Sequence, residues 1–399
     1  MTSGLIADSI IDLCGAIGLC VAMMTFYRRD RKSPLSHRLL FALGIIATLF
    51  LIRAGAWWTG SAFLDRLSDL PAALIPLGAL AITEGILRRH APRAAKMAVL
   101  IGGIVLGIGG VFGLDRFTAL FAAVLFLFQL AGLSVCAWLL ATRDRTTLMA
   151  SENRNIGRLA VGALLVIPFI LTDFRTLLPE IPVRLGALGA LLTVTVMLTA
   201  GSGAETRRHG LTMMALRLIS SALLGLAAAF IAPDVDAAQI VRFSAVAVAG
   251  VLTIGMMTDA LRSLFESQEP GVLNSVAASP AQTRDQLIAE LTRHPIFESA
   301  RRYREGDLAP YDPPLLRDFL STRHVLRLSD APWGLTWTDP AVERMVSLLT
   351  ANSATHLIAL AHDPTDTIVL AVPVISADPA TETALSLVQR LLVLTPEAK

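Results

Sequence analysis

The stretch LLFALGIIATLFLIRAGAWW, residues 39–58, decides the fold class, because only one of its residues, Arg53, carries a charge. A helix of about 20 apolar residues crosses the roughly 30 Å hydrocarbon core of a bilayer. Similar apolar stretches recur through residues 1–265, and 54% of the whole chain is hydrophobic. We therefore predict a polytopic α-helical membrane protein.

Nine stretches are apolar enough to be membrane spans when hydropathy is averaged over windows of roughly 19 residues. The sixth and the seventh are shorter than most of the others. The predicted spans lie near Leu5–Tyr27, Leu39–Trp58, Leu70–Leu87, Ala95–Phe112, Phe117–Thr142, Leu159–Leu171, Leu185–Thr199, Leu211–Ile231 and Phe243–Phe265. Together they predict an α-helical bundle of about nine spans over residues 1–265.

The connections between these spans alternate between many and few basic residues. Loops rich in lysine and arginine stay on the cytoplasmic side of a membrane. The rich set holds Arg28, Arg29, Arg31, Lys32, Arg38, Arg88, Arg89, Arg93, Lys96, Arg143, Arg145, Arg154, Arg158, Arg207, Arg208 and Arg217, and the poor set holds Arg66, Arg116, Arg175, Arg184 and Arg242. We expect a multi-pass protein of the bacterial inner membrane, with its N-terminus outside and its C-terminus in the cytoplasm.

The last third of the chain has a different pattern. Residues 266–281 contain Ser, Gln, Pro and Gly without an apolar period, which predicts a linker to a domain at residues 282–399. In that domain Asp339-Pro340 and Asp378-Pro379 each predict a helix start, with Asp as the N-cap and Pro at the first helical position. Further helices are expected over Gln282–His294 and Pro314–Leu320, a strand over Thr322–Leu328, and an antiparallel hairpin over His356–Ala361 and Thr367–Val374. These elements predict a small cytosolic α+β domain.

Three sequence runs carry a resemblance to a known family. HVLRLSDAPWG (residues 324–334), THLIALA (355–361) and TIVLAVPV (367–374), with the order strand, helix, hairpin and closing helix over Phe319–Leu394, resemble the second half of a degenerate GAF domain. GAF domains are regulatory modules of bacterial signalling proteins. The Asn-Lys and Asp-Glu signature of cyclic-nucleotide-binding members is absent, and no cysteine follows Cys136 to attach a linear tetrapyrrole. The resemblance implies a module for protein contacts, and in architecture the membrane half resembles multi-span sensor regions of bacterial histidine kinases.

Arg53 is the most prominent ionisable residue inside a predicted span. Such a residue is costly to bury in a membrane, so it is a functional candidate by default. Arg53 could bind an anionic ligand, or it could pair with Asp8 or Asp12 of the first span, and a partner pair is the commoner fate. Asp173 and Arg175, at the end of the sixth span, are expected at the membrane interface.

Glu84, near the end of the third span, is a second intramembrane candidate. A carboxylate at this depth could contact a ligand or carry a proton. Arg88 follows four residues later, a favourable spacing for an ion pair on a helix. We favour this structural interpretation of Glu84.

Two prolines predict helix kinks. Pro76 lies in the third span and Pro168 in the sixth, and each removes a backbone hydrogen bond from its helix. Paired broken helices can line a transport site, and kinks are also frequent in ordinary bundles. Transport is therefore an alternative that the prolines leave open.

No motif for catalysis, metal binding or a cofactor stands out in the chain. His294 is the only histidine worth testing as a phosphoacceptor, and it lacks the flanking residues of a kinase H-box. Residues 264–399 carry 17 acidic and 11 basic residues, which argues against a nucleic-acid-binding tail. We expect no enzymatic activity, no metal and no cofactor.

These observations favour a membrane sensor or regulatory protein. It would relay a signal through its cytosolic domain to a protein partner, a kinase or a regulator. The alternatives are a transporter or lipid-handling protein with a regulatory domain, and a structural subunit of a membrane complex. A polar-lined pore would favour transport, whereas a closed bundle with an exposed apolar patch on the cytosolic domain would favour signalling or assembly. The sequence predicts neither the ligand nor the oligomeric state.

Overall fold

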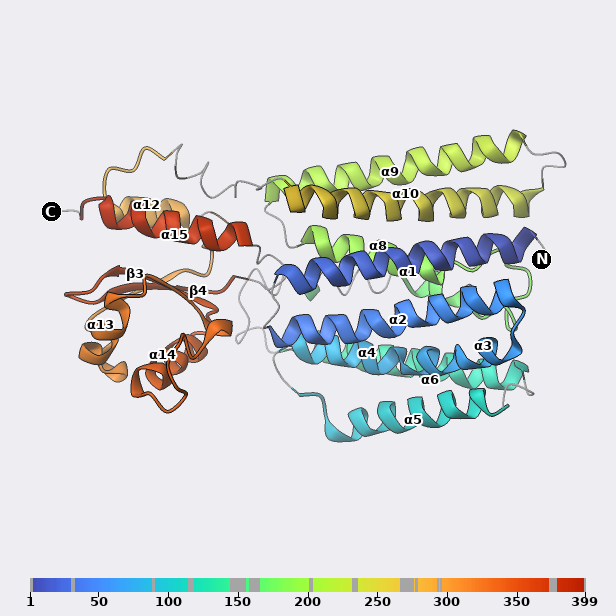
Figure 1. Cartoon of the computed structure of the whole chain (residues 1–399), viewed down its shortest axis with the longest axis horizontal. Helices are drawn as coiled ribbons and strands as arrows, with labels where there is room; N and C mark the ends of the chain where they lie inside the picture. The colour runs from blue at the N-terminus through green and yellow to red at the C-terminus, as the bar shows by residue number, and fades with distance from the viewer. Residues whose placement is uncertain are drawn as a thin grey trace. The chain divides into compact units, whose positions relative to one another are not determined.

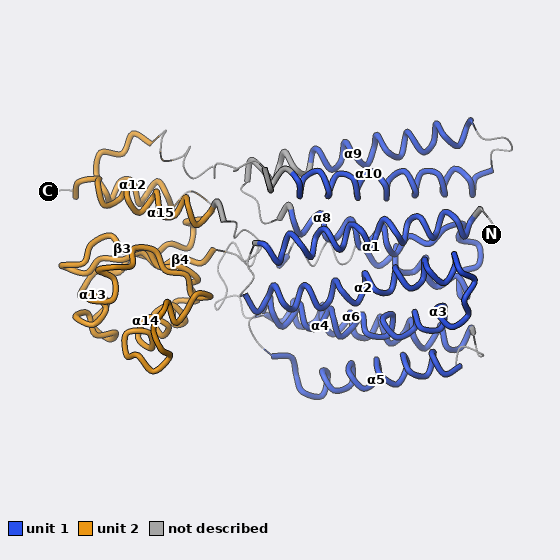
Figure 2. Tube along the Cα trace, viewed as in Figure 1, with its two compact units in different colours: residues 1–143, 155–200, 207–265 blue, residues 144–154, 201–206, 266–399 orange. Residues whose placement is uncertain are grey.

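The computed structural model describes residues 3–29, 33–87, 90–113, 118–143, 156–157, 166–200, 204–231, 236–265, 276, 279–292, 294, 296–372 and 379–397. They form two compact units, a helical unit that ends at Phe265 and an α+β unit (Figures 1 and 2). Much of the predicted linker, residues 266–275 and 277–278, lies outside the described residues.

Seven helices within the described ranges are long and apolar enough to cross a membrane. They correspond to predicted spans one to five, eight and nine. The helices of this unit are α1 (Ser3–Arg29), α2 (Pro34–Thr59), α3 (Ala62–Leu67), α4 (Asp69–Leu87), α5 (Arg93–Val111), α6 (Thr118–Ala141), α8 (Gly186–Ala200), α9 (Ala204–Ile231) and α10 (Ala237–Phe265). Predicted span seven is the short apolar helix α8, and residues 159–165 of predicted span six lie outside the description, so the count of nine stays a prediction.

Local sequence sets the ends of α2. The Ser33 hydroxyl accepts a hydrogen bond from the Leu35 N–H, and Pro34 occupies the first turn, where a missing N–H costs nothing. Gly60 ends the helix in the left-handed conformation at φ 65°, which glycine adopts without strain. Ser61 then caps α3, so the chain leaves one helix and enters the next within two residues.

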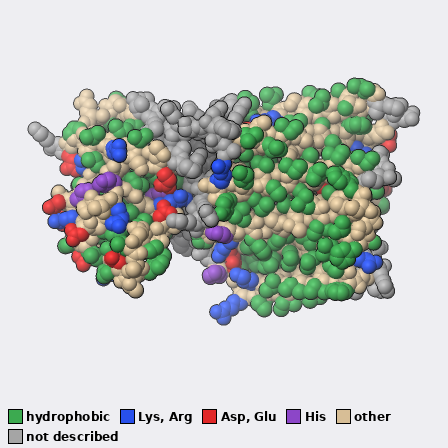
Figure 3. Space-filling model, viewed as in Figure 1, with side chains coloured by type: hydrophobic (Ala, Val, Ile, Leu, Met, Phe, Trp, Pro, Cys, Tyr) green, Lys and Arg blue, Asp and Glu red, His purple; other side chains and the backbone are tan. Residues whose placement is uncertain are grey.

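The core of the helical unit lies where α1 packs against α2, α8 and α10. Ile11, Leu19, Leu39 and Leu191 are almost completely buried there. On the face drawn in Figure 3, hydrophobic side chains cover the helical unit, as expected for a surface in contact with lipid. The structure therefore supports a multi-pass membrane protein.

The α+β unit consists of a four-stranded antiparallel sheet between two layers of helices. The strand order is β1-β4-β3-β2. Its elements are α12 (Arg284–Leu291), β1 (Arg301–Arg304), α13 (Pro313–Ser321), β2 (Val325–Arg327), α14 (Pro340–Ala351), β3 (His356–Ala361), β4 (Asp366–Leu370) and α15 (Pro379–Leu394), with short 3₁₀ turns at Ala309–Tyr311 and Leu328–Asp330.

Side-chain alternation along the hairpin explains the two layers. Leu357 pairs with Val369, and both pack with α13 and α14 on one face of the sheet. The next pair, Ile358 and Ile368, packs with α12 and α15 on the other face. Because successive residues of a strand point to opposite faces, burial on both sides explains the continuous apolar runs at 357–361 and 368–370.

Most of the α+β elements match the sequence predictions. The predicted hairpin is present as β3 and β4, although β4 ends at Leu370 and residues 373–374 lie outside the description. The Asp339 carboxylate caps α14 as expected, by accepting the Ala341 N–H at 2.9 Å. The strand β1, Arg301–Arg304, was not predicted, because three of its four residues are arginine. It lies at the edge of the sheet, where charged side chains are tolerated.

Candidate functional site

Arg53 of α2 is buried and holds two carboxylates. Its Nε and Nη2 donate to the two oxygens of Asp12 on α1, at 2.5 and 2.8 Å, and its Nη1 donates to Asp173 at 3.0 Å. The Asp12 side chain is 0% exposed. This bidentate pairing compensates the charges of Arg53 and Asp12, each of which would be costly to bury alone. Of the two partners expected from the first span, the structure thus pairs Arg53 with Asp12 and not with Asp8.

Asp173 reaches Arg53 because the backbone after residue 171 is irregular until α8 begins at Gly186. The Asp173 side chain lies against α2 and is 18% exposed; its place at the membrane interface stays a prediction. Asp173 also accepts the Gly186 N–H at 3.1 Å, and the Thr172 hydroxyl accepts the Leu185 N–H at 2.7 Å. Non-helical backbone in a membrane protein needs such internal partners, so these side chains stabilise the irregular segment.

Asp8 binds the far end of the same segment. Its side chain is completely buried, and it accepts the backbone N–H of Arg184 at 2.8 Å. Its other oxygen lies 2.9 Å from Nη1 of Arg175. Asp8 and Asp12 are four residues apart on α1 and therefore share one face. Asp8 contacts the irregular segment directly, whereas Asp12 is linked to it only through Arg53 of α2.

Trp57 adds an aromatic surface to the cluster. The guanidinium carbon of Arg53 lies 5.5 Å from the centre of its ring, and that of Arg184 lies 4.9 Å from the same centre. Both distances are within the range of cation–π attraction. The indole of Trp57 therefore holds Arg184 beside the Arg53 ion pairs.

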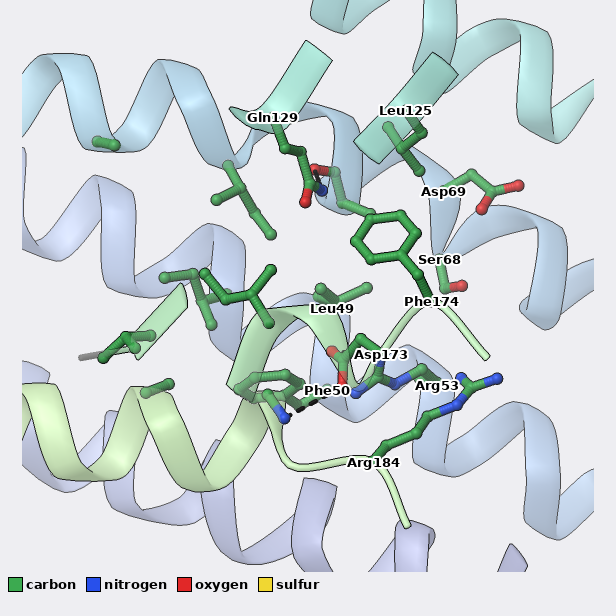
Figure 4. Close-up of a pocket in the computed structure, with 18 of the residues that line it drawn as sticks. Leu49, Phe50, Arg53, Ser68, Asp69, Leu125, Gln129, Asp173, Phe174 and Arg184 are labelled. Atoms are coloured by element: carbon green, nitrogen blue, oxygen red, sulfur yellow. Dashed lines mark hydrogen bonds and ion pairs between the residues drawn. The ribbon is translucent and has the colours of Figure 1, made fainter. Parts of the chain in front are cut away.

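Four of these charged residues line a cavity of about 480 Å³ in the helical unit: Arg53, Asp173, Arg175 and Arg184. Figure 4 shows Arg53, Asp173 and Arg184 grouped on one side and Gln129 on another. The walls come mainly from apolar side chains of α2, α4, α6 and α8. Gln129 contributes an amide whose Nε2 donates to the Ala72 carbonyl at 2.8 Å. A mostly apolar cavity with a few placed polar groups is typical of a small-molecule site.

Glu84 takes partners other than the one expected. It is buried on α4 and accepts the Ala91 N–H at 2.9 Å and two contacts from Nζ of Lys96, at 3.1 and 3.2 Å. Arg88, the expected partner, lies outside the described residues. Glu84 does not line the cavity. Its contacts join α4 to the start of α5, which is a structural role.

The two prolines lie close to the cavity without lining it. The ring of Pro76, inside α4, packs against Gly132 of α6, where an added Cβ would come within 2.5 Å of it. Pro168 lies in a helical stretch at residues 166–171. Their neighbours Ile75 and Ile170 do line the cavity. Both prolines thus lie beside residues that line the cavity, and the kinks expected at them stay predictions.

The α+β unit contains a buried polar pair and no metal cluster within its described residues. His356 is 1% exposed, and its two ring nitrogens lie 2.8 Å from Glu382 and from the Thr355 hydroxyl. Burial favours the protonated acid, but the His356 hydrogen bond and the charges of His356 and Arg327 outweigh it and lower the pKa of Glu382. The His356–Glu382 pair joins β3 to α15.

His294 is the histidine that the sequence singled out as a phosphoacceptor to test. Burial lowers the pKa of its side chain.

The sequence predictions did not include Arg184 among the site residues, because it counted only as a loop cation, and they placed Arg175 at the membrane interface without a partner. A signal was present nonetheless. TDFRTLLPEIPVR, residues 172–184, places four charges and two prolines between apolar stretches, which predicts irregular backbone in a membrane half. The contacts of Arg175 and Arg184 with Asp8 could not be predicted, because Asp8 is far from both residues in the sequence.

Comparison of the chain with family models, curated proteins and solved structures gives no match. The geometry of the cavity and of the charged cluster is therefore the basis for the function proposed next.

Proposed function

We propose that the protein is a membrane sensor or regulatory protein without catalytic activity of its own. Its helical unit binds a ligand in the cavity, and its α+β unit passes the signal to a protein partner, a kinase or a regulator. The observation that carries the proposal is the cavity of about 480 Å³, with apolar walls and a charged end. Pockets for small molecules have volumes of about 300–1,000 Å³ and this mixture of surfaces.

The α+β unit supports a role in protein contacts. Leu387, Leu391 and Leu394 recur at helical spacing on α15 and are exposed. Trp337 is also exposed, at 65%. Exposed apolar residues in such a row are common at protein interfaces. An exposed apolar surface on the α+β unit is consistent with the resemblance to a GAF domain. In this proposal the protein lies in the bacterial inner membrane with nine spans. Its N-terminus is outside and the α+β unit is in the cytoplasm.

Filling the cavity tests whether it communicates with the α+β unit. Ala122 of α6 lines the cavity, whereas Ala131 of the same helix is exposed on the outer surface. We expect Ala122→Phe to change hydrogen exchange within residues 282–397 of the full chain in nanodiscs of phosphatidylethanolamine and phosphatidylglycerol. The matched variant Ala131→Phe should leave the exchange unchanged. Identical exchange in both variants and the wild type would contradict the sensor proposal.

Transport or lipid handling is the second candidate, and the irregular segment favours it. Non-helical backbone after residue 171 lies beside the cavity, and Asp173, Arg175 and Thr176 from it line the cavity wall. Broken helices in this position contribute to substrate sites in transporters. If filling the cavity leaves the α+β unit unaffected, this second function becomes the better proposal.

A further inference from the structure

We propose that the cavity binds a single-chain amphiphile whose anionic group, a carboxylate or a phosphate, is held by Arg184 and Arg175. This deepens the proposed function and rests on it, because the same cavity is the ligand site. A volume of about 480 Å³ lies toward the lower end of the range of about 300–1,000 Å³ for small-molecule pockets, which favours one chain over two.

Arg184 is the arginine of the cluster whose guanidinium has no carboxylate partner among the described residues. Its backbone N–H binds Asp8, and its guanidinium rests on the ring of Trp57. Its Nε is buried and has no hydrogen-bond partner in that part of the chain. A buried donor without an acceptor is unfavourable, so an acceptor from a ligand would stabilise it.

Arg175 supplies a second donor to the same end of the cavity. Its Nη1 pairs with Asp8 at 2.9 Å, while its Nε is buried with no acceptor in the described structure. Arg175 and Arg184 both line the cavity. An anionic group between them would receive charge-assisted hydrogen bonds, which are stronger than neutral ones.

The neighbouring carboxylates either have partners already or are exposed. Arg53 binds Asp12 and Asp173, as described above. Asp65 on α3 is exposed, where solvent and salt screen its charge. Asp69 lies at the start of α4, against Gly110 of α5. The buried cluster holds three arginines and three carboxylates, so its charges balance, and the unpartnered Nε donors of Arg184 and Arg175 mark the place where an anionic group would be bound.

The apolar walls can accommodate an alkyl chain, but they contribute little to the free energy of binding. Lipid tails are as apolar as leucine side chains, so a chain gains little by moving from the bilayer into the cavity. The charged end must then decide which amphiphile binds. This makes Arg184 the residue whose replacement tests the ligand class.

Native mass spectrometry of the full chain would compare four probes: dodecyl phosphate, dodecanol, dodecyltrimethylammonium and inorganic phosphate. We expect dodecyl phosphate to bind best, at one molecule per chain. Arg184→Gln should weaken it about tenfold or more, as expected for a lost charge-assisted hydrogen bond, and Arg184→Lys should restore part of the affinity. Ala122→Phe should also weaken binding. Arg93→Gln, at an exposed arginine of α5, is the control and should match the wild type.

Three results would overturn the proposal. Equal binding of dodecanol would show that the anionic group is not recognised, and preference for dodecyltrimethylammonium would assign the site to the carboxylates. Inorganic phosphate bound as tightly as dodecyl phosphate, and insensitive to Ala122→Phe, would place anion binding outside the cavity. If Arg184→Gln fails to fold, the comparison of the four probes on the wild type and on Ala122→Phe still tests whether the cavity prefers an anionic amphiphile.

The ligand class and the sensor function can fail separately. If the amphiphile is not preferred but Ala122→Phe still alters exchange in the α+β unit, the ligand class is wrong and the sensor function stands. If the amphiphile binds but exchange in the α+β unit never changes, the site exists and the sensor function is wrong.

Discussion

Arg53 shows how an otherwise apolar span carries a charge. The Arg53 side chain is 8% exposed, and its guanidinium binds Asp12 and Asp173 through three donors. Breaking a buried ion pair leaves one charge uncompensated, which is more costly than removing both partners. The triad therefore joins α1, α2 and the segment before α8 at a single point.

We expect Arg53→Met to lower the free energy of unfolding by about 3–5 kcal/mol, because Asp12 and Asp173 lose their cation. Adding Asp12→Leu should recover part of this loss. The measurement is an unfolding titration with sodium dodecyl sulfate in mixed micelles. Arg93→Met, at an exposed position, should change stability by less than about 0.5 kcal/mol. An Arg53→Met protein as stable as the wild type would mean that the triad contributes nothing.

At the scale of elements, small residues set how closely the helices of the bundle approach. Gly103 and Gly107 of α5 lie against the backbone of α4, at Ala73 and Leu70. Gly225 of α9 lies against the backbone of α10 at Ser244. Lipid tails are as apolar as leucine, so no hydrophobic driving force brings membrane helices together and they depend on such close packing.

Gly225→Ala should separate α9 from α10, because the new Cβ would lie 2.4 Å from the Ser244 Cα, which cannot move aside like a side chain. We expect a loss of about 1–3 kcal/mol, as for other overpacked sites. Gly250→Ala on α10 meets nothing within 4 Å and is the control; its effect should stay within about 1 kcal/mol. Equal stability of the two variants, in the same titration, would contradict the close contact.

For the whole molecule, the decisive question is which side of the membrane each connection occupies. The uneven distribution of basic residues predicts an outside N-terminus. Reporter fusions after Arg66, Arg93, Arg116 and Arg154 should then lie outside, inside, outside and inside. A fusion at Lys399 on the outer side would refute this topology and the cytoplasmic role of the α+β unit.

The sequence alone determined the elements whose physics is local. Length and hydropathy predicted closely the seven long apolar helices found among the described residues, because a span needs only apolar residues in a row. The Asp339-Pro340 cap and the β3–β4 hairpin were likewise predicted, since caps and alternating apolar strands are properties of short segments. The charge of Arg53 inside a span marked it as a site candidate.

Only the tertiary structure decided which partners meet. Asp8 and Arg184 are far apart in the sequence, and their contact depends on how α1 packs against the segment before α8. The strand β1 forms because it can pair with the edge of β4. Its own arginine-rich sequence does not indicate a strand. The cavity too belongs to no single segment, since several helices close around it. Contacts between distant segments depend on packing, and packing is set by the whole fold.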